Sequence, residues 1–105
     1  MTDTDIMANH NRLVAEAKEN LAELTSTLSN KITILGELKA GRGADEHERL
    51  SAKARGIGTG LKIAQESESP SVAYWAMSEA LSTTPEDERP GLEIAIQDAM
   101  LISRL

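Results

Sequence analysis

Apolar side chains recur at helical spacing through the first third of the chain. From Ile6 onward they are three or four residues apart, and no Gly or Pro occurs before Gly36. This spacing predicts a helix over about residues 5–40, capped by Thr4 or Asp5, with one apolar row. The positions in that row are Ile6, His10, Leu13, Ala17, Leu21, Leu24, Leu28, Ile32 and Leu35.

A heptad pattern fits the same segment in part. Two of its d positions hold polar residues, His10 and Lys31. The steps of three and four residues average closer to an 11-residue repeat, so we expect coiled-coil character without a strong left-handed supercoil. The apolar a positions of the heptad are Met7, Val14, Leu21, Leu28 and Leu35.

A second helix is predicted over about residues 45–66, after a glycine-containing turn at 41–43. Its apolar positions keep helical spacing, but three glycines interrupt the pattern within five residues. Such a cluster predicts a break or kink at 56–60, or close backbone contact with a neighbouring helix. The three glycines are Gly56, Gly58 and Gly60.

Two shorter helices complete the predicted fold. Ser69-Pro70 combines an N-cap residue with a proline at the first helical position, which predicts a third helix over about 70–82. Thr84-Pro85 repeats the signal and Pro90 follows, so a fourth helix is expected from about 86 or 90 to 105. The polar strip of this fourth helix is narrow, so we expect a partner helix to cover part of its wide apolar surface. The prediction is a single all-α domain over 1–105, completed by oligomerisation.

The composition strengthens the expectation of a homo-oligomer. The 105-residue chain has no Phe and no Cys, and it has one Trp and one Tyr. A core without large rings or disulfides is marginal at this size, and oligomerisation is a common remedy. We expect a dimer first. The predicted interface residues are Leu21, Leu24, Leu28, Leu35, Ile94, Leu101 and Leu105.

The charge disfavours nucleic acid and membrane surfaces as partners. Eleven basic and 17 acidic side chains give a net charge of −6, and no basic stripe is present. An acidic surface suits a basic protein partner instead. The acidic start of the chain does not resemble a secretory signal, and no apolar run approaches the ~20 residues of a membrane span. We therefore expect a cytoplasmic protein.

The glycine cluster lies among basic residues, which makes it a candidate ligand site. Free backbone N–H groups and nearby cations could bind a nucleotide phosphate. The spacing matches neither the Walker A motif nor G-x-G-x-x-G, and no strand precedes it, so we favour a helix contact made by Gly56 and Gly60. The candidate ligand residues are Lys53, Arg55, Gly56, Gly58, Gly60 and Lys62.

Other chemistry has little support in the sequence. His10 and His47 are the only histidines and lack the spacing of zinc ligands, so we expect no metal, no cofactor and no catalytic residue. Tyr74 and Trp75 are the only aromatic residues. They could anchor a protein partner or fill the core.

In architecture alone, the chain resembles the WXG100-type helical hairpins that type VII systems export in pairs. The shared features are the length, the long first helix, the central glycine turn and the acidic charge. The turn Ala40-Gly41-Arg42-Gly43 lacks the W-x-G motif, and three prolines interrupt what would be the second helix. Our first hypothesis is a non-enzymatic protein–protein interaction module of adaptor, inhibitor, immunity or phage-accessory type, acting as a homo-oligomer. The alternatives are the small-anion site and an exported helical pair.

Overall fold

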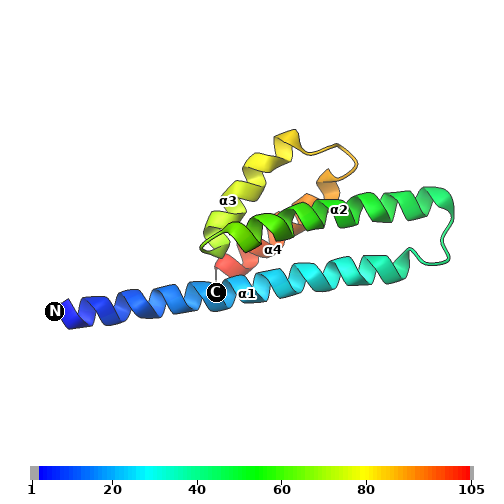
Figure 1. Cartoon of the computed structure of the whole chain (residues 1–105). Coiled ribbons are helices and arrows are strands. Elements are labelled where there is room, and N and C mark those ends of the chain that lie inside the picture. Colours follow the sequence, from blue (N-terminus) through cyan, green and yellow to red (C-terminus); the bar gives the residue numbers. More distant parts are fainter. Residues whose placement is uncertain (1–2, 105) are drawn as a thin grey trace.

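The computed structural model describes residues 3–104 and confirms the all-α fold, with no strand in that range. Its helices are α1 (Asp3–Leu38), α2 (Ala44–Glu66), α3 (Pro70–Ala80) and α4 (Arg89–Ser103), with a short 3₁₀ helix η1 (Leu81–Thr83) after α3. Helices α1 and α2 run antiparallel as a hairpin, and α4 packs against both of them (Figure 1). Helix α3 contacts α4 more extensively than it contacts the hairpin.

Helix α1 begins and ends slightly earlier than the sequence predicts. It begins at Asp3, so Thr4 and Asp5 lie within its first turn and do not cap it. After Leu38 the chain turns through Gly41, whose φ of 77° lies in the left-handed region that glycine adopts without strain. Arg42 Nε donates to the carbonyl oxygen of Leu38 at 3.1 Å and thereby satisfies one terminal acceptor of the helix.

The expected break at 56–60 is absent, because α2 continues as a helix from Ala44 to Glu66. Gly56 and Gly60 make the close contact with a neighbouring helix that we favoured from the sequence. A Cβ atom added to Gly56 would lie 2.7 Å from the backbone nitrogen of Leu92 in α4, and Gly60 faces Ala95 one turn further along. Contact with α4 therefore takes the place of the side-chain packing that helical glycines lack.

Helix α3 begins as its Ser-Pro pair predicts. The Ser69 side chain accepts a hydrogen bond from the backbone N–H of Val72 at 3.2 Å, and Pro70 occupies the first turn. The later Thr-Pro pair acts differently. Thr84 Oγ1 donates to the carbonyl oxygen of Ala80 at 2.7 Å, while Pro85 starts a single turn that leads into α4.

Replacing Ser69 with Ala should lower the free energy of unfolding by about 1 kcal/mol, because an N–H group at the start of α3 loses its side-chain acceptor. Urea denaturation followed by circular dichroism would measure the change. Ser71→Ala is the matched control, since Ser71 is exposed and is not the N-cap residue. Equal stability of the two variants would contradict the capping role.

A single core lies between the four helices. Its largest fully buried side chains are Leu24, Leu28, Ile57, Met77 and Leu92. Helices α1, α2 and α3 of the same chain bury one face of α4. That face consists of Leu92, Ala95, Ala99 and Ile102. The expected cover of α4 by a second copy stays a prediction for the rest of this helix.

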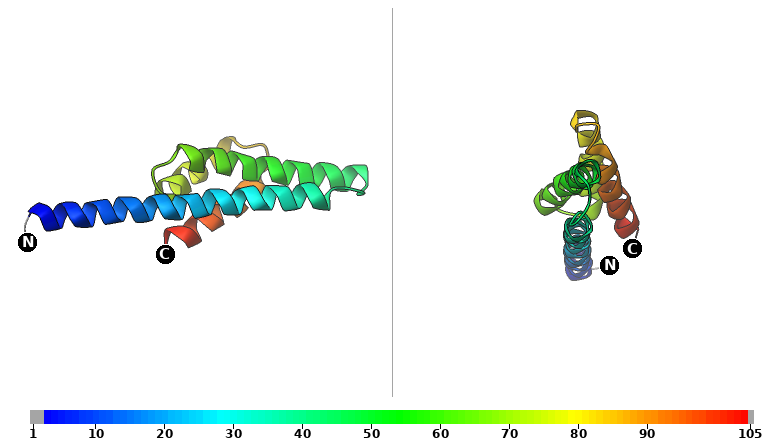
Figure 2. Two further views of the ribbon diagram at one scale, coloured as in Figure 1. Left: turned by 60° about the horizontal axis from the view of Figure 1, so that its bottom comes forward. Right: turned by 90° about the vertical axis from the view of Figure 1, so that its right-hand side faces the viewer.

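The hairpin is asymmetric, because α1 has 36 residues and α2 has 23. The N-terminal part of α1 consequently projects beyond the bundle, and the molecule with this projection measures 63 Å along its longest axis (Figure 2). Residues 5–16 are all exposed, and partial burial begins at Ala17. We call residues 5–21 the N-terminal arm.

Candidate functional site

The N-terminal arm carries a row of exposed apolar side chains. This row continues into the core, where Leu24 and Leu28 belong to the same helical face and are fully buried. Scattered exposed apolar residues are common in soluble proteins, whereas a contiguous set marks an interaction surface. The exposed fractions on the arm are 52% for Ile6, 65% for Met7, 57% for Leu13 and 40% for Val14.

A groove runs between the arm and the start of α3. Its volume is about 660 Å³, and its apolar wall comes from both elements. Lys18 of the arm and Glu68 of the α2–α3 connection add one charge of each sign. The apolar lining is Leu13, Val14, Ala17, Leu21 and Val72.

The acidic side chains of the arm face away from this groove. Glu16 and Glu19 of the arm, and Glu23 just beyond it, follow one another at helical spacing on the opposite side of α1 from the apolar row. Arg12 joins them there through an ion pair with Glu16, with 4.0 Å between Nε and Oε1. The arm is therefore amphipathic, with an apolar face on one side and a charged face on the other.

The two aromatic residues lie on α3 and contact each other. Their ring centroids are 5.4 Å apart in an edge-to-face arrangement. Tyr74 packs against the core, whereas Trp75 is 67% exposed. Because Val72 and Trp75 are three residues apart, they lie on neighbouring parts of one helix surface. Trp75 thus extends the apolar surface at the groove.

The glycine–basic segment, residues 53–62, does not form a loop whose backbone N–H groups could bind a phosphate. Residues 56–60 are helical, so their N–H groups serve the helix, and Gly56 and Gly60 are buried against α4. Gly58 has no neighbouring atom where its Cβ would lie. Lys53 and Lys62 are nine residues apart and face roughly opposite sides of the helix.

The guanidinium of Arg55 pairs with carboxylates of the same chain, which leaves it unsuited to bind a ligand. Its guanidinium contacts Glu48 at 3.1 Å within α2 and Glu88 at 3.2 Å at the start of α4, and Asp87 lies 3.8 Å away. The hydrogen bonds to Glu48 and then Glu88 raise the pKa of Arg55 above its usual value. This cluster ties α2 to the N-terminal end of α4.

The predicted interface residues divide into three groups. Leu24, Leu28 and Leu35 are core residues of the single chain, which corrects their assignment to an interface. Leu21 and Ile94 are half-buried, and Leu101 is 55% exposed. Leu105 lies outside the described residues. Among the interface residues that the structure describes, the second group is the one that retains surface for a partner.

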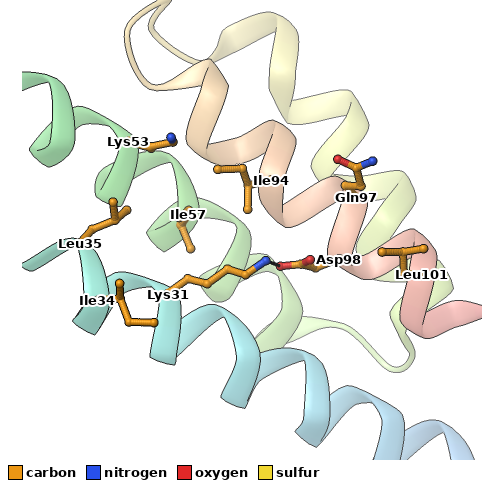
Figure 3. Close-up of a pocket in the computed structure, with 9 residues that line it drawn as sticks. All are labelled: Lys31, Ile34, Leu35, Lys53, Ile57, Ile94, Gln97, Asp98 and Leu101. Carbon is orange, nitrogen blue, oxygen red and sulfur yellow. Dashed lines mark hydrogen bonds and ion pairs between the residues drawn. The ribbon is translucent and has the colours of Figure 1, made fainter. Parts of the chain in front are cut away.

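A second pocket opens between α1, α2 and α4, with a volume of about 420 Å³ (Figure 3). Lys31 of α1 donates to Asp98 of α4 across it, with 2.5 Å between Nζ and Oδ2. Lys53 of α2 also lines the pocket. No sequence pattern predicted this pocket, although Lys31 at a d position placed a polar group inside an apolar row.

The acidic first turn of α2 has a local structural role. Arg49 donates to Glu46 at 2.5 Å, and this hydrogen bond is the main cause that lowers the pKa of Glu46. His47 is exposed nearby. Within residues 3–104 no three or more His, Asp or Glu side chains gather in a way that could hold a metal ion.

No helix in the described part of the chain combines the length and apolar character needed to cross a bilayer. Comparison of the chain with protein-family models, with curated proteins and with solved structures finds no match.

Proposed function

We propose that the protein is a non-enzymatic helical interaction module that works as a homodimer, formed by the N-terminal arms of two copies. The observation that carries this proposal is the exposed apolar row of the arm, with its groove against α3. The glycine–basic segment supplies no competing ligand loop, since it forms part of a packed helix.

The arm needs support that its own chain does not supply. Residues 5–16 are all exposed in the single chain. Most of the stability of a helix in a protein comes from packing of its apolar face rather than from helix propensity, and this part of α1 lacks that packing. A partner that covers Ile6, Met7 and Val14 would provide that packing.

A second copy suits this surface by its charge. Each copy carries a net charge of −6, so contact between two acidic faces would be repulsive. The arm presents its apolar face toward the groove and turns Glu16 and Glu19 away from it. Two copies can therefore meet there without juxtaposing the carboxylates of their arms.

The groove also offers charges that a two-fold arrangement can pair. In an isologous interface, a residue of one copy meets a different residue of the other, and the reverse contact follows by symmetry. Lys18 and Glu68 line the same groove and have no ion pair with each other. We infer that Lys18 of each copy pairs with Glu68 of the other.

The dimer would leave an acidic outer surface for a further protein. Residues 69–105 contain two basic and six acidic side chains. Complementary charge accelerates encounter and selects partners more than it adds affinity. The proposed role is therefore that of an adaptor or inhibitor for a basic protein.

Replacing Val14 with Glu should convert the dimer to a monomer at micromolar concentration. The substitution places a carboxylate in the centre of the apolar row, where a second copy would bury the charge without a partner. Sedimentation velocity would give twice the 11.3 kDa chain mass for the wild type and the single mass for the variant. Helix content by circular dichroism should fall by no more than the contribution of the arm residues.

Leu38→Glu is the matched control, because Leu38 is also an exposed apolar residue of α1 but lies at the far end from the arm. This variant should remain dimeric. A monomeric wild type, or a dimer that survives Val14→Glu, would overturn the proposal.

A further inference from the structure

We propose that the pocket between α1, α2 and α4 binds a small amphipathic monocarboxylate, with its carboxylate on Lys53 and its apolar chain between the helices. This pocket is separate from the N-terminal arm, so the proposed ligand site does not depend on the proposed dimer. Figure 3 shows Lys53 on one wall and Ile94 facing it from α4.

The pocket has the form of a small-molecule site. Its volume of about 420 Å³ lies within the usual range for such pockets, about 300–1,000 Å³, and three helices form its walls. Ile57 is buried, whereas Ile34 and Leu101 are about half exposed. These side chains give the site an apolar interior that remains open to solvent.

The charges inside the pocket do not cancel. Lys31 and Asp98 neutralise each other through their ion pair at 2.5 Å. Lys53 is half-buried, and it has no ion pair among the residues that the structure describes. Arg49 and Arg55 are the other two cations in the N-terminal half of α2, and each has a carboxylate partner. One positive charge is therefore left at the edge of an apolar cavity.

This residual charge selects the class of ligand. A half-buried ammonium is partly desolvated, and a charge-assisted hydrogen bond to an anion compensates for that loss. The apolar walls require a hydrocarbon segment, while Gln97 supplies an amide at the rim. A single carboxylate on an alkyl chain meets all three conditions, whereas a nucleotide would bring more negative charge than the one free lysine can balance.

Titration of the wild-type protein with decanoate, followed by NMR of amide and methyl groups, tests the proposal. Saturable shifts should concentrate at Ile34, Ile57 and Ile94. In Lys53→Met, which keeps an unbranched apolar side chain but removes the charge, decanoate affinity should fall about tenfold or more. Decanol, which lacks the charge, should bind both proteins equally.

Lys62→Met is the matched control, since Lys62 is an exposed lysine on the other side of α2. It should leave decanoate affinity unchanged. Three results would each overturn the proposal: no saturable binding, an equal affinity for decanoate in wild type and Lys53→Met, or shifts centred on Leu13 and Val72 in the arm groove.

Discussion

Gly91→Ala is expected to destabilise the protein by about 3 kcal/mol, the upper end of the usual cost of overpacking. Gly91 lies in the first turn of α4, directly against the backbone of α2. An added Cβ would lie 2.9 Å from the amide nitrogen of Ile57 and 2.9 Å from the carbonyl carbon of Lys53. Both neighbours are backbone atoms, which a rotamer change cannot move.

Chemical denaturation of Gly91→Ala beside Gly58→Ala would measure this effect. Gly58 lies on α2 itself, but a Cβ there has no atom within 4 Å. Alanine is a better helix former than glycine, so Gly58→Ala should stabilise the protein by about 0.5–1 kcal/mol. Opposite signs for the two variants are the expected result, and wild-type stability of Gly91→Ala would show that the two backbones are further apart.

The helices were predictable because their signals are local. Apolar spacing, the Ser69-Pro70 pair and the glycine turn each act within a few residues. The behaviour of 56–60 was harder to decide, because local rules for three glycines allow both a break and a packed helix. Contact with Gly91 on α4, more than 30 positions along the chain, selects the packed helix, and no local pattern contains that information.

The candidate surfaces were less predictable for the same reason. The row on α1 has one spacing throughout, yet its first half is exposed and its second half is buried. The difference arises because α2 is shorter than α1 and covers only part of it. The pocket depends on Lys31 meeting Asp98 across 67 positions of sequence, so only the packing of three helices creates it.

Leu28→Ala is expected to cost about 2–5 kcal/mol, because a fully buried leucine loses its contacts and leaves a cavity. This loss arises inside one chain. The midpoint of thermal unfolding should therefore fall by a similar amount at low and high protein concentration. Differential scanning calorimetry at two concentrations would measure it.

Leu13→Ala is the matched variant, because Leu13 occupies the same row of α1 but is 57% exposed in the single chain. If the arm is a dimer surface, this substitution weakens association, and its effect on the unfolding midpoint should change with protein concentration, since assembly stabilises the fold by mass action. If the arm is free, Leu13→Ala should have almost no effect at either concentration. The two leucines differ in burial and not in sequence pattern, so the pair of variants separates the part of the row that holds one chain together from the part that we propose joins two chains.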